Sequence, residues 1–210
     1  MKRITILLTL LLTLNLMVFA QKDKDKVIQS LDAQANEFTK VAKQIWENPE
    51  LGYLEEKSSA LLKGELEKAG FKIESGVAGI PTAFTATYGT GKPVIGILGE
   101  FDALPGMSQE AVPVKQPRVE GAPGQACGHH LFGTGSAAAA IGVKEWLVNN
   151  KKSGTIRFYG TPAEEGGSGK VYMVREGLFN DVDAVVSWHA GDANACNPST
   201  NLATISGKFR

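Results

Sequence analysis

The chain has 210 residues, of which 43% are hydrophobic and 21% are charged, so it can bury one substantial core, and disorder is not the default expectation. Lysine plus arginine and aspartate plus glutamate balance at 22 each, which leaves no positive excess to hold nucleic acid or an anionic membrane surface. We therefore expect no nucleic-acid partner.

The N-terminal segment has the pattern of a secretory signal peptide. Lys2 and Arg3 precede an apolar run that ends at Ala20. A membrane anchor is the alternative, but Asn15 interrupts the run, and a spanning helix needs about 20 mostly apolar residues. We expect residues 1–20 to be cleaved, which predicts an exported protein, periplasmic or secreted, without a stable membrane anchor.

Apolar periodicity predicts helices and strands in alternation along the rest of the chain. In chain order, we expect helices at 22–48 and 55–69, strands at 71–75, 82–88 and 93–99, an irregular Pro- and Gly-rich loop at 105–124, a helix at 131–148, a strand at 155–159, a helix at 169–176, and strands at 184–188 and 204–209. This order predicts an α/β sandwich with a mainly parallel central sheet. In such sheets, functional sites form at the carboxyl ends of the strands.

The most reactive side chains gather in three places, each at or beyond the end of an expected strand or its loop. They are Cys127, His129 and His130, then Glu164 and Glu165, then His189. Because the carboxyl ends of parallel strands meet at one edge of a sheet, we expect these side chains to lie close together. Thiolate, imidazole and carboxylate are the ligands that hold zinc and similar divalent ions. The sequence therefore predicts a metal centre.

The spacing within these clusters suits a hydrolase. Cys127 and His129 are separated by one glycine, and in an extended turn such side chains can point the same way. In an extended segment, Glu164 and Glu165 would point to opposite sides, so that one can bind metal while the other contacts the metal-bound water.

Other interpretations of the same residues stay open. A Cys-Gly-His triplet is often loop and core, an acidic pair is usually solvated, and His189 could be a buried structural histidine. A different enzyme class would use Cys127 as a nucleophile, with His129 or His189 as its base. This would leave the two glutamates without a role. A third interpretation is a metal-binding remnant without catalysis.

Four stretches of the sequence together resemble the M20 family of metallopeptidases and amidohydrolases, in particular its aminobenzoyl-glutamate hydrolase branch. They are residues 99–106, 126–130, 161–167 and 187–189. The resemblance implies a zinc-exopeptidase-like three-layer sandwich that cleaves the amide bond of an N-acyl amino acid, a small-molecule substrate. It also implies two divalent metal ions, zinc by preference, with manganese or cobalt as alternatives.

The resemblance further implies roles for individual residues. Cys127, His129, Glu165 and His189 would be metal ligands, and Glu164 the general base. His130 stands where many relatives carry aspartate, so we expect it to support the site or face the substrate. Other family members carry histidine where this chain has Glu100. Asp102 would then lack its usual ligand partner, and we expect it to have only a supporting role.

The domain organisation expected from the resemblance has three parts: the signal peptide at 1–20, the N-terminal part of a catalytic domain at 21–202, and the start of a lid domain at 203–210. We expect the chain to be a fragment with the lid absent or only begun, inactive alone. A homodimer is expected only for the full-length protein, through that lid.

Overall fold

The computed structural model describes residues 2–196, and side chains from residue 22 onward. The helices are α1 (Lys2–Glu47), α2 (Glu56–Lys68), α3 (His129–Asn149), α4 (Glu164–Gly167) and α5 (Gly169–Arg175), with a short 3-10 turn η1 (Val77–Gly79). The strands are β1 (Lys72–Ser75), β2 (Phe84–Thr90), β3 (Val94–Gly99), β4 (Gly154–Gly160) and β5 (Ala184–Val186). Every helix and strand expected between residues 22 and 188 is confirmed. The strand expected at 204–209 and the start of the lid lie outside the described residues.

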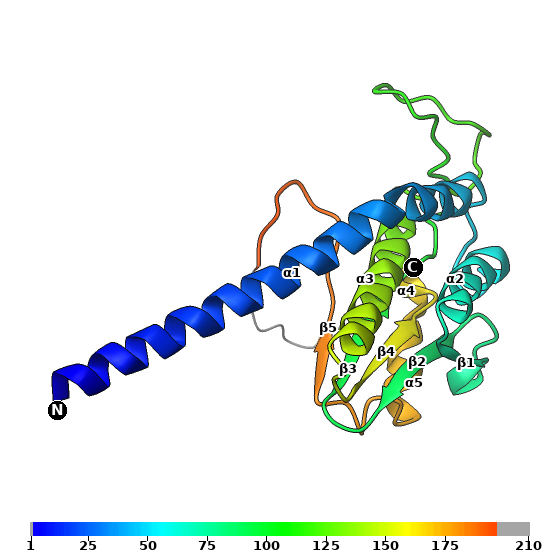
Figure 1. The fold of residues 1–210 in the computed structure, drawn as a ribbon. Coiled ribbons are helices and arrows are strands. Elements are labelled where there is room, and N and C mark those ends of the chain that lie inside the picture. Colours follow the sequence, from blue (N-terminus) through cyan, green and yellow to red (C-terminus); the bar gives the residue numbers. More distant parts are fainter. Residues whose placement is uncertain (1, 197–210) are drawn as a thin grey trace.

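Helix α1 is longer than the expected helix at 22–48, because it begins at Lys2. Figure 1 shows its N-terminal part extending away from the sheet, while its C-terminal part lies across α3. Within the described part of the chain, no helix is both long and apolar enough to cross a bilayer. The cleaved signal peptide stays a prediction.

The five strands form one mixed sheet in the order β1-β2-β4-β3-β5. β2 pairs antiparallel with both β1 and β4, whereas β3 pairs parallel with β4 and with β5. The α/β prediction is confirmed, and the parallel pairings are those on which a site at the carboxyl ends depends. β1 and β2 can be antiparallel because a short connection joins them, while β3 reaches β4 through the crossover helix α3.

Alternation along β4 shows how the two faces of the sheet are covered. Ile156 and Phe158 point into the main core with α2 and α3. On the other face, Tyr159 stacks on Phe179 with ring centroids 4.3 Å apart, and Arg157 forms an ion pair with Asp181. The segment from α5 to β5 therefore covers this second face, which gives the three layers expected from the resemblance (Figure 1).

Aromatic rings fill the core directly beneath the carboxyl ends of the strands. Phe84 stacks between Phe101 and Phe158, with ring centroids 6.3 and 5.5 Å away, and all three are fully buried. Burial of each such ring contributes roughly 1.5–3 kcal/mol to the stability of the fold. This packed cluster of aromatic rings thus lies beneath the loops that carry the predicted site.

Candidate metal centre

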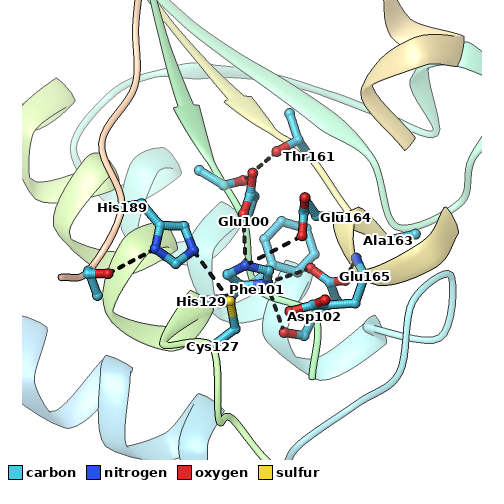
Figure 2. Close-up of polar contacts among 12 residues, drawn as sticks. Glu100, Phe101, Asp102, Cys127, His129, Thr161, Ala163, Glu164, Glu165 and His189 are labelled. Atoms are coloured by element: carbon cyan, nitrogen blue, oxygen red, sulfur yellow. Dashed lines mark hydrogen bonds and ion pairs between the residues drawn. The ribbon is translucent and has the colours of Figure 1, made fainter. Parts of the chain in front are cut away.

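The parallel part of the sheet brings the predicted residues to one edge. Glu100 follows β3 directly, Glu164 begins α4 four residues after β4 ends, and His189 lies three residues beyond β5. Figure 2 shows these side chains around the ring of His129, with Cys127 beside them. The predicted convergence of three separated stretches of sequence is confirmed.

Cys127 and His129 reach the site through a tight turn, not through the extended turn that we expected. Gly128 has a left-handed backbone (φ 85°), and His129 is already the first residue of α3. A Cβ at Gly128 would lie 3.2 Å from the Cβ of Ala190, in a backbone conformation that strains other residues. Glycine at this position therefore lets the cysteine and the histidine face the same space.

Two groups of potential metal ligands share His129. The Cys127 sulfur and ring nitrogens of His129 and His189 lie within 4.8 Å of one another, and so do ligand atoms of Glu100, His129 and Glu164. The sulfur of Cys127 is 3.4 Å from Nε2 of His189. These side chains offer sulfur, nitrogen and oxygen donors in one small volume, which is a ligand set suited to zinc.

Hydrogen bonds to the backbone and to Asp102 orient both histidines. Nδ1 of His129 lies 2.9 Å from Oδ1 of Asp102, and Nδ1 of His189 lies 2.9 Å from the carbonyl oxygen of Ala190. When each Nδ1 donates its proton to that oxygen, each Nε2 presents a lone pair to the centre of the site. The second carboxylate oxygen of Asp102 accepts the backbone N–H of Glu165 at 2.8 Å. Asp102 therefore contacts two predicted ligands, and its supporting role stays a prediction.

Unpaired polar atoms provide a test of whether metal fits here. Oε2 of Glu100 and Nε2 of His129 are buried and 2.9 Å apart, but neither has a well-aligned hydrogen-bond partner among the described residues. Oε1 of Glu165 is buried and unpartnered in the same way. Leaving such atoms unpaired is costly, and a cation between them would satisfy them together. The residues present thus fit divalent metal.

Glu100 and Lys170 are parts of the site that sequence reasoning missed. The sequence indicated Glu100 only as the residue that replaces a histidine, yet its carboxylate joins His129 and Glu164 in a possible ligand group. Its other oxygen forms an ion pair with the ammonium group of Lys170. Burial alone would raise the pKa of Glu100, but the nearby ring of His129 and the ammonium group of Lys170 outweigh it and lower that pKa. The position of Glu100 directly after β3 was the signal that could have revealed it.

The paired glutamates do not lie in the extended segment that we expected. Both are in the single turn of α4, where Glu165 has a non-helical backbone (φ −69°, ψ 79°). This kink still separates their side chains: Oε2 of Glu164 lies 3.8 Å from Nε2 of His129, whereas Glu165 lies against Cys127. The predicted division between the two carboxylates is therefore compatible with the geometry, for a different local reason.

His130 lies beside this centre but belongs to neither ligand group. Its backbone N–H donates to Oε1 of Gln125 at 3.1 Å, and its ring Nδ1 is buried without a hydrogen-bond partner among the described residues. Burial, followed by the charge of neighbouring His129, lowers the pKa of His130. A supporting or substrate-facing role stays a prediction.

The charges around Cys127 bear on its chemistry. Burial, together with a hydrogen bond to Glu165 and the charges of nearby carboxylates, raises the pKa of Cys127 to about 12. Burial and the negative charge of Glu100 likewise raise the pKa of Glu164. A thiol with this pKa is protonated at neutral pH, so it is a poor nucleophile without a cation beside it.

The contact between Asp102 and His129 leads to a testable expectation for metal affinity. Replacing Asp102 by asparagine should weaken metal binding about 10- to 100-fold, because the histidine ring loses the carboxylate that fixes its orientation and basicity. Titration with zinc and a competing chelator measures this change. Asp32→Asn is the matched control, since Asp32 is exposed on α1. Equal affinity of the Asp102 variant and the control would show that Asp102 does not act through His129.

A cavity of about 370 Å³ lies next to the loop that carries Cys127. Trp46, the loop residues 106–109 and Arg118 form much of its lining, and its wall includes Gln125 and Ala126, which directly precede the cysteine. The guanidinium of Arg118 lies 4.9 Å from the ring centroid of Trp46. The cavity thus ends at the two residues before Cys127, and its lining carries the charged side chains of Lys115, Arg118 and Glu120.

Comparison with known proteins decides the family. The sequence model of Peptidase family M20/M25/M40 matches residues 96–202, which include every residue of the candidate centre. The chain is 47% identical to a p-aminobenzoyl-glutamate hydrolase subunit of Escherichia coli over 86% of its length. The chain belongs to the M20 family. It is also 31% identical to human Xaa-Arg dipeptidase over 80% of its length.

A solved structure of another M20 member has the same fold. The YXEP protein of Bacillus subtilis, described as a dinuclear metal-binding peptidase, is 29% identical, with a TM-score of 0.58, and the match covers 73% of this chain and 42% of YXEP. The chain spans 38% of the length of the Escherichia coli hydrolase subunit and 38% of the human dipeptidase. The predicted M20 resemblance, the fold class and membership of a hydrolase family are thereby confirmed.

Proposed function

We propose that this chain supplies the metal-binding part of a two-metal amidohydrolase that cleaves the amide bond of an N-acyl amino acid of the aminobenzoyl-glutamate type. The observation that carries the proposal is the convergence of Cys127, Glu100 and Glu164 around the buried ring of His129, where several ligand atoms have no hydrogen-bond partner among the described residues. The similarity to an aminobenzoyl-glutamate hydrolase subunit supports the substrate class.

Cys127, His129, Glu165 and His189 would hold the ions, with Glu100 as a further oxygen donor that faces them. Two divalent ions there would supply Lewis acidity, which acidifies water and polarises a scissile carbonyl group. The mixed donors favour zinc, while manganese and cobalt are alternatives. The cavity whose lining includes Gln125 and Ala126, the two residues before Cys127, would hold a small acylated amino acid.

Glu164 is the residue proposed to move protons. Its side chain is 45% exposed, so it can reach a water molecule at the mouth of the site. Its raised pKa brings it closer to neutrality, where a carboxylate can accept a proton from the attacking water and return it to the departing amine. Glu165 is held instead by its backbone contact with Asp102 and faces Cys127.

The alternatives of a cysteine nucleophile and of an inactive metal-binding remnant are less well supported. The raised pKa of Cys127 is opposite in direction to the shift that activates a thiol. The remnant would need only metal ligands, whereas the exposed side chain of Glu164 also offers a carboxylate that can reach water at the same centre. We therefore retain a hydrolase as the proposal for the whole protein.

We also propose a location and an assembly for the whole protein. Residues 1–20 would direct export to the periplasm or the outside of the cell, and a lid domain from about residue 203 would complete the substrate site and form a homodimer. The Escherichia coli relative is named as one subunit of its hydrolase, which suggests a second kind of subunit as the alternative partner. Sedimentation of the purified whole protein, alone and with candidate subunits, distinguishes the two assemblies.

Removal and return of metal test the proposed chemistry. Treatment of the whole protein with a chelator should abolish release of glutamate from p-aminobenzoyl-glutamate, and zinc, manganese or cobalt should restore it. An alkylating reagent applied to the metal-loaded protein should have little effect, because metal would shield the thiolate. Hydrolysis that survives complete metal removal but stops on alkylation would replace the proposal with the cysteine-nucleophile mechanism.

A further inference from the structure

Glu55 is a fully buried acid that belongs neither to the groups of potential metal ligands nor to the hydrophobic core. It directly precedes α2, is 0% exposed, and lies far from Glu164 in the sequence. Burial of a carboxyl group is unfavourable unless its oxygens are hydrogen-bonded. Burial raises the pKa of Glu55, while the hydrogen bonds that it accepts oppose this effect.

Both oxygens of Glu55 are occupied, and one of them holds the segment that carries the paired glutamates. Oε1 accepts the backbone N–H of Ala163 at 2.8 Å, and Oε2 accepts the hydroxyl of Thr82 at 2.9 Å. Ala163 is fully buried and immediately precedes Glu164. Glu55 therefore ties the start of α4 to the loop before β2.

The conformation of Ala163 explains why such a tie is needed. Its backbone is left-handed, with φ of 55° and ψ of 44°, which is unfavourable for a residue with a Cβ. Such strain persists only where surrounding contacts hold the backbone in the strained conformation, and it is frequent at functional sites. Figure 2 shows Ala163 at the base of the turn from which the side chains of Glu164 and Glu165 project.

The residues just before Glu55 contact the same turn. A Cβ at Gly52 would lie 2.9 Å from both Cα and Cβ of Ala163, so only glycine lets the two segments touch. The hydroxyl of Tyr53 donates to the carbonyl oxygen of Gly167, at the other end of α4. Residues 52–55 thus contact the turn at its beginning and at its end.

We propose that Glu55 is a positioning residue for the reaction, which fixes the strained turn at Ala163 and thereby the placement of Glu164 over the site. This inference rests on the proposed function and adds a residue that acts through the backbone, without touching substrate or metal. The role depends on two hydrogen bonds, to Ala163 and to Thr82, and not on charge. Glutamine can keep both contacts, because its carbonyl oxygen accepts from Ala163 while its amide donates to the hydroxyl oxygen of Thr82.

Kinetics of the whole protein test this role. Glu55→Met, which keeps the length of the side chain but removes both acceptors, should lower kcat about 100-fold, as expected for a misplaced catalytic group. KM and bound metal should stay at wild-type values, and Glu55→Gln should retain kcat within about threefold. Glu56→Met is the matched control, since Glu56 is the exposed neighbour. Equal losses in the methionine and glutamine variants, or no loss in either, would overturn the proposal.

Hydrogen exchange separates this inference from the proposed function. In Glu55→Met, the amide of Ala163 should exchange at least about tenfold faster than in the wild type, while the glutamine variant keeps its protection. This measurement needs neither metal nor substrate. If the wild-type protein proved inactive, faster exchange at Ala163 would still support the positioning contact, and unchanged exchange would exclude it.

Discussion

Replacing Glu164 by glutamine is expected to reduce turnover of an N-acyl amino acid by about 100- to 10,000-fold, because the amide cannot accept the proton of the attacking water. Bound metal should stay near the wild-type amount. The reason is that Glu164 is the exposed member of the pair, whereas Glu165 is held against Cys127. Product release at saturating substrate and elemental analysis of the same sample measure the two quantities together.

A control variant makes this result specific. Glu176→Gln removes the same charge from an exposed residue just after α5 and should leave turnover as in the wild type. Turnover of the Glu164 variant within tenfold of the wild type would remove Glu164 as the base. A loss of metal in parallel with turnover would instead assign Glu164 to the ligands.

Replacing His129 by asparagine is expected to produce the largest loss of metal. His129 belongs to both ligand groups, so one substitution should weaken binding at each of them, by at least about 100-fold. Burial opposes protonation of this ring, but its hydrogen bond to Asp102 and the adjacent carboxylate of Glu100 raise the pKa of His129 to about 10 in the metal-free protein. A proton therefore competes with metal for Nε2, and affinity should fall as the pH is lowered.

His130→Asn provides the comparison, since this neighbouring ring is in neither ligand group. Isothermal titration with zinc should show that the His130 variant loses much less affinity than the His129 variant. Circular dichroism of both variants checks that the fold is kept. Equal affinity of the His129 variant and the wild type would end the case for a metal centre at this place.

Local pattern predicted the elements of this fold because apolar periodicity reflects which face of each segment is buried. The helix at 131–148 and the strands at 93–99 and 155–159 correspond closely to α3, β3 and β4. The pattern could not show that β2 pairs antiparallel with β4, because strand direction depends on how connections cross the sheet. The residues that converge were likewise predictable, since they follow parallel strands.

The contacts of two buried acids could not be predicted in the same way. Glu100 stood in the sequence as a replacement for a missing histidine, and Glu55 was simply the start of a helix. Neighbouring residues do not reveal the contacts of either acid, because their partners, Lys170 and Ala163, lie 70 and 108 residues away. Their roles depend on burial, and burial is a property of the assembled layers.

The sequence by itself determined the chemistry that is available: a thiol, imidazoles and carboxylates placed after strands that end at one edge of a sheet. The tertiary structure alone decided how these groups are held, through the left-handed turns at Gly128 and Ala163 and the hydrogen bonds of Asp102 and Glu55. The physical reason is the distance along the sequence over which each property is determined. Side-chain type and periodicity are written in neighbouring residues, whereas the orientation of a buried polar group is fixed by donors and acceptors that only folding brings within about 3 Å of it.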